Sequence, residues 1–409
     1  MATGLDVWLI PITQWGCVQL VTALAVALTP SQSALRSAAA VIVVALAYSF
    51  QCRINEALSD TRAGGPLVAM CWVNVLNAMD LLVWRRIAYE DQIQWEQNTH
   101  LPHSTTNRPR TVSNRHLWSF AIAFNYRRIN TPWQIAKLPR FDESNPRYVP
   151  TRGKFLLVCV MKLCVAVVFL SLFIIDANDP YLPGAIGGLA HRDSVLLPWV
   201  YAASTRRAII QMCFVISFGV VCRATIVAGY NLMAIVAVAG RIYDPVEWPP
   251  IASSLTEAYS LRRLWGTAWH QTLRELLTSN ADVITSSLLR IPRDSKWARY
   301  PRVVIAFVLS GLFHTGMDVA FGISLDDSGA LRFFFLQAVG ILVENAFQSV
   351  FRDHVKKVSP IMQRVAGYIW VCAFLLWVSP VWLNPMLLAL FRDGTPLFSP
   401  FLMFKSRPI

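Results

Sequence analysis

Long apolar segments separated by polar stretches recur along the whole chain. A membrane-spanning helix needs roughly 20 predominantly apolar residues, and several segments reach that length. Their apolar residues are continuous rather than alternating, which favours helices over the strands of a membrane β-barrel. The pattern therefore predicts an all-α polytopic membrane protein with about eight or nine transmembrane helices. The expected spans are residues 5–28, 36–51, 66–84, 154–175, 207–240, 303–324, 331–350 and 365–391.

The composition agrees with this class of protein. Of the 409 residues, 55% are hydrophobic and 15% are charged, whereas soluble domains carry roughly 25% charged residues. Most of the eight cysteines lie inside apolar segments and no Cys-x-x-Cys occurs, so we expect buried free thiols rather than a disulfide framework or a metal site. The sequence contains no Walker loop, nucleophile elbow or His-Glu-x-x-His motif. We therefore expect residues 1–409 to form a single integral membrane domain with no bound cofactor and no metal.

The charges lie between the apolar segments. The formal net charge is +13, and residues 85–154 contain twelve Lys or Arg against five Asp or Glu. Residues 241–302 contain nine against six, and the link 325–330 contains no basic residue. Because cytosolic loops are enriched in Lys and Arg, we expect 85–153 and 241–302 to be cytosolic loops with amphipathic helices, and 325–330 and the N-terminus to be lumenal. This arrangement requires 207–240 to cross once, as one long helix rather than two.

The most informative single residue is His314, which lies within the apolar segment 303–324. Hydrocarbon cannot solvate an imidazole, so a histidine at membrane depth needs a partner or a water-filled cavity and indicates a functional site. Asp318 lies four residues later and therefore on the same helical face, where its carboxylate could fix the imidazole tautomer and raise its basicity. Ser310 and Gly311 allow close approach of another helix or a ligand. The alternative is a histidine bonded to a neighbouring helix for packing alone.

A second group of polar and aromatic residues lies in the 241–302 loop. Ser254 and Glu257 form a possible capping box, and the apolar residues that follow have helical spacing and include two tryptophans. On the opposite face of this predicted helix, two arginines would flank His270 and could grip phosphate groups. An amphipathic helix resting on the membrane surface would show the same pattern, so both interpretations stay open. The apolar stripe is Leu261, Leu264, Trp265, Ala268, Trp269, Leu273 and Leu276, and the polar stripe is Arg263, Thr267, His270 and Arg274.

Two further polar stripes lie inside predicted spans. A buried glutamate in one of them must be paired or protonated. Each stripe could line a substrate site or a cavity, and hydrogen bonding between helices is the favoured interpretation of both. The stripes are Gln337, Glu344 and Gln348 in one span, and Asn74, Asn77 and Asp80 in the other.

The motifs in these segments resemble those of the wax-synthase-type branch of the membrane-bound O-acyltransferase superfamily, in particular its fungal members that acetylate terpenoid or polyketide products. One match is Trp248-Pro249-Pro250 followed by Ser-Leu-Arg-Arg-Leu-Trp-Gly-Thr-Ala-Trp-His-Gln at 260–271, where the family has Trp-Pro-Pro and Ser-Leu-Arg-x-Phe-Trp-x-x-x-Trp-His. The other is Ser-Gly-Leu-Phe-His at 310–314, similar to the family's Ser-Gly-x-x-His. Thr131-Pro132-Trp133 is a weaker match, and Arg127-Arg128 stands where the family often has Arg-Gly.

The resemblance implies a membrane-bound O-acyltransferase fold and a role for each histidine. His314 corresponds to the family's intramembrane catalytic base, and His270 to the residue that positions the reacting acyl group. We expect Asp318 to assist His314 in catalysis. The residues expected to bind substrates are Trp265, Trp269, Arg263, Arg274 and Glu344, with the two arginines contacting the phosphates of cytosolic coenzyme A.

The resemblance also implies a reaction. The expected activity is transfer of an acyl group, acetyl from acetyl-CoA, to a hydroxyl of a lipophilic secondary metabolite such as a terpenoid or meroterpenoid. One alternative is a wax ester synthase that joins a long-chain acyl-CoA to a fatty alcohol. Another, of a different class, is a proton-coupled transporter in which His314, Asp318 and Glu344 form the relay. We expect a multi-pass protein of the endoplasmic reticulum membrane whose partners are acyl-CoA, the alcohol and membrane lipids, with neither nucleic acid nor an obligate protein partner.

Overall fold

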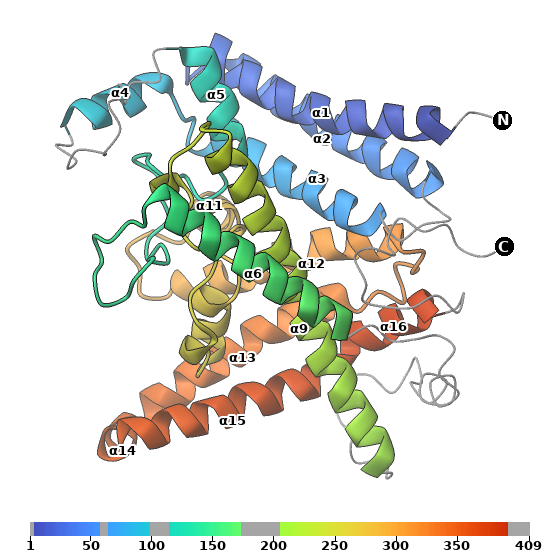
Figure 1. The fold of residues 1–409 in the computed structure, drawn as a ribbon, viewed down its shortest axis with the longest axis vertical. Helices are drawn as coiled ribbons and strands as arrows, with labels where there is room; N and C mark the ends of the chain where they lie inside the picture. Colours follow the sequence, from blue (N-terminus) through green and yellow to red (C-terminus); the bar gives the residue numbers. More distant parts are fainter. Residues whose placement is uncertain (1–3, 58–63, 99–113, 173–204, 392–409) are drawn as a thin grey trace. The chain divides into compact units, whose positions relative to one another are not determined.

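The computed structural model of the chain describes residues 4–57, 64–98, 114–172 and 205–391. All regular secondary structure in these residues is helical, which confirms the predicted all-α class (Figure 1). The chain divides into two compact units. The first unit contains residues 1–59, 64–136 and 272–309, and the second contains 60–63, 137–271 and 310–409.

Apart from 365–391, each predicted membrane span corresponds to one apolar helix in the described residues. Eight helices in the described residues are long and apolar enough to cross a membrane, and the protein is therefore an integral multi-pass membrane protein. Segment 207–240 forms one helix, α9 (Thr205–Ala239), as the single-crossing prediction requires. The predicted span 365–391 is wrong, because α15 (Pro360–Val378) ends before Pro380 and α16 (Pro380–Phe391) is a separate helix. Proline has no N–H to continue the helical hydrogen bonds, so a break at this position is expected on physical grounds.

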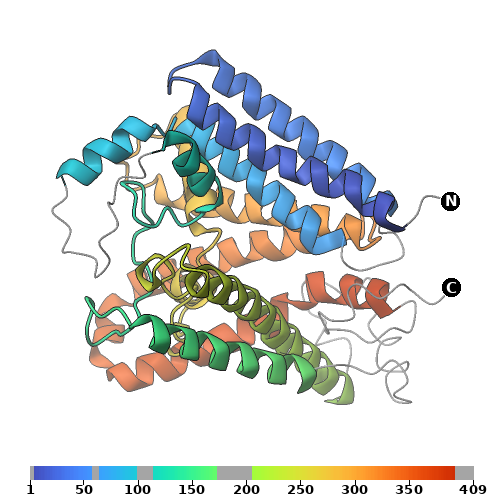
Figure 2. The same ribbon diagram turned by 45° about the horizontal axis from the view of Figure 1, so that its top comes forward.

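The first unit is built on three neighbouring apolar helices. Helix α1 (Gly4–Leu28) packs against α2 (Ala34–Ala57) and α5 (Arg115–Phe124), and α2 packs against α3 (Gly64–Ala78) (Figure 2). The third helix continues into a wider π-helical turn over Met79–Trp84. The helices of this unit are α1 (Gly4–Leu28), α2 (Ala34–Ala57), α3 (Gly64–Ala78), α4 (Tyr89–Asn98), α5 (Arg115–Phe124) and α11 (Arg274–Val283).

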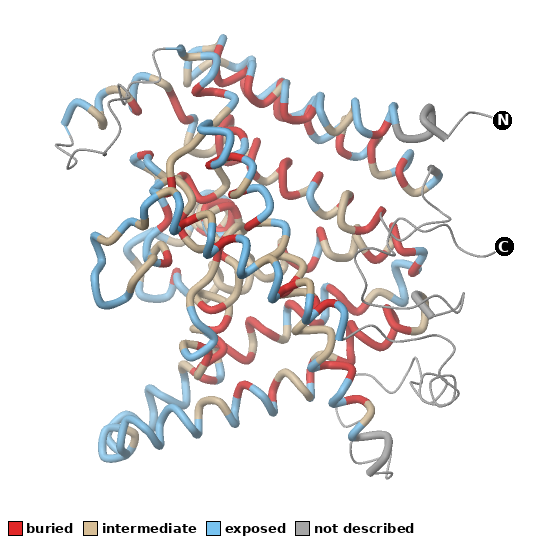
Figure 3. The backbone as a smooth tube through the Cα atoms, in the orientation of Figure 1, coloured by how far each residue is buried: buried red, intermediate tan, exposed pale blue. Residues whose placement is uncertain are grey.

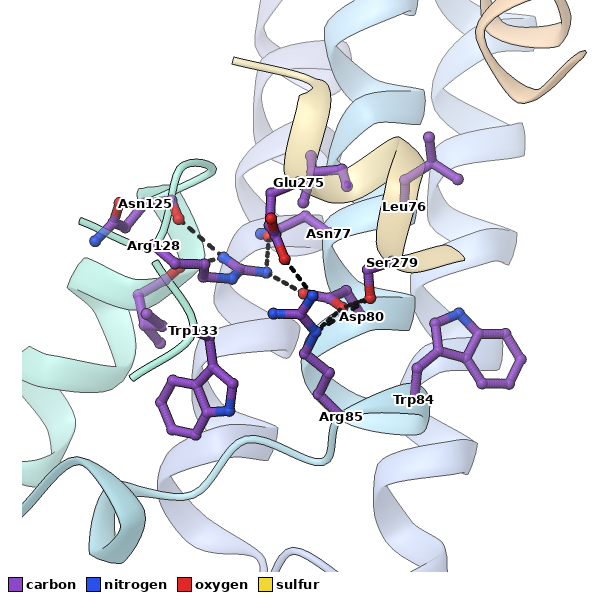
Figure 4. Close-up of polar contacts among 12 residues, drawn as sticks. Leu76, Asn77, Asp80, Trp84, Arg85, Asn125, Arg128, Trp133, Glu275 and Ser279 are labelled. Atoms are coloured by element: carbon purple, nitrogen blue, oxygen red, sulfur yellow. Dashed lines mark hydrogen bonds and ion pairs between the residues drawn. The ribbon is translucent and has the colours of Figure 1, made fainter. Parts of the chain in front are cut away.

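A buried ionic network ties the loop after α5 to the end of α3 in the first unit (Figure 4). Arg128 is fully buried, and its guanidinium donates to Asp80 at 2.8 Å and to Asn77 at 2.7 Å. Asp80 also accepts from Arg85 and from Ser279 of α11. The prediction that the polar stripe Asn74, Asn77 and Asp80 makes hydrogen bonds to neighbouring segments is therefore confirmed.

The backbone at Arg128 has a φ of +54°, in the left-handed region that favours glycine. A glycine at this position, as expected from the Arg-Gly motif that the sequence resembles, would adopt the same backbone without strain. In this chain the arginine side chain is retained in the strained position because it fills the buried charge network. The departure from the family motif thus has a structural reason.

The second unit consists of long apolar helices around the broken segment that carries His270. Helix α6 lies along α9 (Figures 1 and 2), and both contribute Phe155, Cys159, Ala234 and Val238 to a common apolar cluster. Gly311 of α12 allows close helix contact, because a Cβ there would lie 2.9 Å from Leu331 Cα. The helices of this unit are α6 (Arg152–Leu172), α9, α10 (Leu261–Arg263), α13 (Ala330–Val350), α14 (Arg352–Lys357), α15 and α16, together with the part of α12 (Arg299–Ala320) from Ser310 on.

Large apolar side chains are exposed along the outer faces of the spanning helices. Val41 of α2 is 69% exposed, Leu157 of α6 is 61% exposed and Ile361 of α15 is 75% exposed. Figure 3 shows these helices with exposed stretches along their length. Lipid tails solvate such surfaces, whereas a soluble protein rarely presents apolar patches of this kind.

Candidate active site

His314 lies on α12 in a cage of aromatic rings within the second unit. The ring is stacked on Phe334 with 4.4 Å between centroids, and Phe313 lies at the same distance. Trp382 of α16 meets the imidazole edge-on at 5.1 Å. The side chain keeps partial exposure, so the cage holds the ring without sealing it.

The hydrogen bond of His314 defines which ring nitrogen can act as a base. Nδ1 lies 2.8 Å from the backbone carbonyl oxygen of Ser310, one turn earlier on α12. A carbonyl oxygen only accepts, so Nδ1 carries the proton of the neutral ring. The lone pair is therefore on Nε2, which is the nitrogen available to remove a proton from a substrate.

The predicted contact between Asp318 and His314 is corrected by the structure. The Asp318 carboxylate is fully buried and accepts from the Ser328 hydroxyl at 2.6 Å and from Trp382 Nε1 at 2.9 Å. The Ser310 carbonyl performs the tautomer-fixing task that the sequence assigned to Asp318. Asp318 instead holds Trp382, whose ring packs against His314.

The predicted long amphipathic helix over residues 261–276 is wrong. Ser254 caps only a single 3-10 turn, Leu255–Glu257, and the chain then forms α10 and a π-helical turn, Leu264–Ala268. It leaves helical conformation at Trp269, where φ is −80° and ψ is 171°. The stripe that would have placed Arg263, Thr267, His270 and Arg274 on one face therefore does not form.

Hydrogen bonds from other segments explain why this helix breaks. Arg223 of α9 donates to the Ala268 carbonyl at 2.6 Å and to the Ser253 carbonyl at 3.3 Å. The backbone N–H of Gln271 donates to the Ile251 carbonyl at 2.8 Å. These tertiary bonds satisfy backbone groups that a continuous helix would have paired internally.

His270 follows the break and is brought near His314. The two rings are close enough to interact electrostatically, and Trp265 and Trp269 lie between them in a series of ring contacts that reaches Phe334. The Nδ1 atom of His270 is buried without a hydrogen-bond partner among the described residues. Burial lowers the pKa of His270 to about 4, with a smaller contribution from the Arg223 charge, so the ring is neutral at pH 7.

The remaining predicted substrate-binding residues have structural partners. Arg263 pairs with Glu257, and its guanidinium lies 4.5 Å from the centre of the Tyr259 ring. Arg274 belongs to the first unit and donates to the Ala136 carbonyl at 2.9 Å. Glu344 is buried and accepts from the backbone N–H of Leu261 at 2.8 Å, so it fixes the start of α10.

Several residues of the site could not be singled out from the sequence. Trp382, Phe334 and Arg223 each lie in an apolar span, and their roles depend on contacts with distant segments. Gln337 belongs to the polar stripe Gln337, Glu344 and Gln348, which is visible in the sequence. Its side-chain oxygen accepts from Trp265 Nε1 at 3.1 Å.

Among the described residues no hydrogen bond occupies Nε2 of His314, which lies in the membrane-spanning helix α12, and a histidine with an available ring nitrogen is suited to acid–base chemistry. The sequence pattern of the Membrane bound O-acyl transferase family matches residues 248–336, which include both histidines. The acetyltransferase fsoF of Humicola fuscoatra is 32% identical over 341 residues, which are 73% of this chain and 76% of that protein. The chain therefore belongs to the membrane-bound O-acyltransferase family and is an O-acyltransferase.

Other similar proteins are also named as fungal acetyltransferases. The acetyltransferase aurG of Calcarisporium arbuscula is 32% identical over 66% of this chain and 65% of its own length. The acetyltransferase spyB of Aspergillus fumigatus is 28% identical over 68% of this chain, and the match spans only 49% of that longer protein. No solved structure matches the chain.

Proposed function

We propose that this protein transfers an acetyl group from acetyl-CoA to a hydroxyl of a lipophilic secondary metabolite, such as a terpenoid or meroterpenoid, with His314 as the general base. The single observation that carries the proposal is the His314 Nδ1 to Ser310 carbonyl distance of 2.8 Å, which leaves Nε2 as the basic nitrogen. The similar fungal proteins fsoF, aurG and spyB are named as acetyltransferases, which supports the choice of acetyl.

In the proposed reaction, His314 Nε2 removes the hydroxyl proton as the alcohol oxygen attacks the thioester carbonyl. The new carbon–oxygen bond forms, the carbon–sulfur bond breaks, and the proton passes from His314 to the leaving thiolate of coenzyme A. An alcohol attacks a thioester poorly until a base takes its proton, and a positioned histidine typically contributes about 10²–10⁴-fold. The acetate ester and free coenzyme A are the products.

His270 has the proposed role of positioning the acyl group. Because its pKa is about 4, the ring is uncharged at neutral pH and acts as a hydrogen-bonding group rather than as a cation. The ring of Trp269 lies next to that of His270 and also contacts the ring of Trp265, with 5.8 Å between the two tryptophan ring centres. A neutral donor aimed at the thioester carbonyl stabilises the negative charge that develops on attack.

The proposed topology brings two substrates from different sides. Coenzyme A is anionic and cytosolic, and Arg263 is the proposed contact for its phosphates, for which it must first exchange its pairing with Glu257. The expected role of Arg274 at the same phosphates stays a prediction from the sequence. The lipophilic alcohol enters from the bilayer. The basic loops agree with a cytosolic donor side, and the endoplasmic reticulum membrane is the proposed location.

The two alternative functions, a wax ester synthase and a proton-coupled transporter, predict different products. A wax ester synthase would use a long-chain acyl donor and a fatty alcohol in place of acetyl-CoA and a terpenoid. The proton-relay alternative has little support, because Asp318 and Glu344 are engaged with Ser328, Trp382 and Leu261.

The proposal is tested with microsomes that contain the protein, incubated with labelled acetyl-CoA and a panel of terpenoid and polyketide alcohols. Mass spectrometry should detect an acetate ester of at least one alcohol that microsomes without the protein do not form. Parallel incubations with octanoyl-CoA and palmitoyl-CoA and a fatty alcohol test the long-chain alternative. Esters formed only from the long-chain donors would overturn the proposed acetyl specificity.

A further inference from the structure

Arg223 is a charged residue close to the middle of the membrane-spanning helix α9. A guanidinium at membrane depth is costly unless it is paired or faces a functional site. In the part of the chain that the structure describes, the hydrogen bonds of Arg223 go to two backbone carbonyls, and no carboxylate forms an ion pair with it. Within the described residues, the positive charge of Arg223 is therefore not neutralised by an acidic side chain.

The two carbonyls that Arg223 binds belong to the segment that carries His270. One is that of Ala268, two residues before His270, at 2.6 Å, and the other is that of Ser253 at 3.3 Å. Ser253 in turn donates its N–H to the carbonyl of Thr267 at 3.0 Å. The guanidinium thus fixes the backbone at the point where the predicted helix breaks, and the direction of His270 depends on that break.

We propose that Arg223 is a positioning residue of the acyl-transfer site, which holds the Ala268–His270 segment and keeps an unneutralised positive charge beside the reacting acyl group. This inference rests on the proposed function. During attack, the carbon–oxygen bond forms before the carbon–sulfur bond breaks, and negative charge builds first on the thioester carbonyl oxygen and then on sulfur. A fixed positive charge in a water-poor site lowers the energy of both negative species without having to reorganise.

The geometry gives a reason why an arginine is present rather than a neutral side chain. A glutamine could also donate to a backbone carbonyl, at a smaller cost in membrane insertion. An arginine presents several N–H donors in a fixed planar arrangement and is always charged. A neutral donor could bind the two carbonyls as well. The positive charge of Arg223 therefore indicates a second use, which is to stabilise negative charge in the site.

The test compares Arg223→Lys with Arg223→Gln in the full-length protein. Lysine keeps the charge and loses the planar pair of donors, whereas glutamine keeps a donor and loses the charge. We expect Arg223→Gln to lower kcat by about tenfold or more, with a smaller change in KM for the acyl donor, and Arg223→Lys to retain at least about a third of the wild-type kcat. Arg241→Gln is the matched control, because Arg241 is exposed just beyond the end of the same helix, and its kcat should stay within about twofold of wild type.

The pH profile separates a charge effect from simple support of the backbone. Among the described residues, Arg223 of α9 is the charged group that acts on the pKa of His270, and His270 in turn interacts electrostatically with His314 of α12. Burial is the larger cause of the lowered pKa of His270 and remains in the variant, so loss of the Arg223 charge raises that pKa only by the smaller Arg223 contribution. Activity of Arg223→Gln should therefore begin to fall at a slightly higher pH on the acid side than that of wild type. Arg223→Lys should keep the wild-type acid limb.

Equal losses of kcat in the lysine and glutamine variants, or an unchanged acid limb in Arg223→Gln, would overturn the inference. If Arg223→Gln fails to accumulate in the membrane, Arg223→Lys decides alone, since a loss of tenfold or more in that variant contradicts a role for the charge. Wild-type ester formation tests the proposed function separately. The variant ratios are measured with whichever acyl-CoA the wild-type protein uses, so the two failures can be told apart.

Discussion

The imidazole Nδ1 of His314 lies 2.8 Å from the carbonyl oxygen of Ser310 on the same helix. This bond within α12 fixes the tautomer of the ring without help from a carboxylate. Because Nδ1 makes this bond, the basic nitrogen of the ring is Nε2. The proposed role of His314 depends on this relationship.

The first prediction concerns Asp318, which holds Trp382 rather than His314. Asp318→Asn keeps a side-chain oxygen that can accept from Trp382 Nε1, whereas Asp318→Ala removes it. We therefore expect Asp318→Ala to lower kcat by about tenfold or more and Asp318→Asn to lower it much less. Steady-state turnover of the two variants measures this, and equal large losses would indicate that the negative charge of Asp318 acts in catalysis.

The second prediction concerns the buried arginine of the first unit. Arg128→Gly removes the strain of a positive φ, but it leaves Asp80 with only Arg85 and Ser279 as partners and removes the guanidinium donor of Asn77. Breaking a buried ion pair costs about 3–5 kcal/mol, whereas relieving a strained backbone position recovers of order 1–3 kcal/mol. The thermal unfolding midpoint in detergent should therefore fall.

Arg290 provides the matched control for this substitution. It has a φ of +55°, close to that of Arg128, but its side chain is exposed. Arg290→Gly should leave the unfolding midpoint unchanged or slightly raised, because only strain is removed. If Arg128→Gly were as stable as Arg290→Gly, the buried network would not contribute to stability.

The third prediction concerns pH and His270. The pKa of His270 is about 4 in the folded protein and about 6.5 in the unfolded chain. Between these values the unfolded state binds the proton and the folded state does not, so the free energy of unfolding decreases as pH falls from about 6.5 toward 4. The contribution is at most about 1.4 kcal/mol for each pH unit.

His270→Gln should flatten this dependence of the unfolding midpoint on pH. His354→Gln is the control, because His354 is exposed on α14 and no similar burial acts on it. An identical pH dependence in wild type and His270→Gln would show that the buried neutral ring is not the source of the effect.

The sequence predicted much of the fold because membrane spans are marked by continuous local hydrophobicity. The two histidines of the candidate site, His314 and His270, could also be picked out from the sequence, since a histidine at membrane depth and a Trp-His motif are both visible in a short stretch of residues; their roles stay predictions. The break between α15 and α16 had a local signal in Pro380 and was nevertheless missed.

The structural features that could not be predicted from the sequence depend on tertiary contacts. The helix predicted through Trp269 is broken by two hydrogen bonds. Arg223 donates to the Ala268 carbonyl, 45 residues later, and the Ile251 carbonyl accepts from the N–H of Gln271, 20 residues later. Asp318 has the spacing expected for a bond to His314, but Trp382, 64 residues later, takes its place. Periodicity gives the face on which a side chain lies, and it does not give the partner that reaches that face.

The most direct test of the account is turnover by His314→Ala. The variant is purified with wild type and with His354→Ala, a control histidine on an exposed helix, and each is assayed with labelled acetyl-CoA and an alcohol that wild type acetylates. We expect His314→Ala to lose about 10²–10⁴-fold in kcat while its membrane content and unfolding midpoint stay near wild type. Wild-type turnover by a folded His314→Ala protein would contradict the assignment of His314 as the catalytic base.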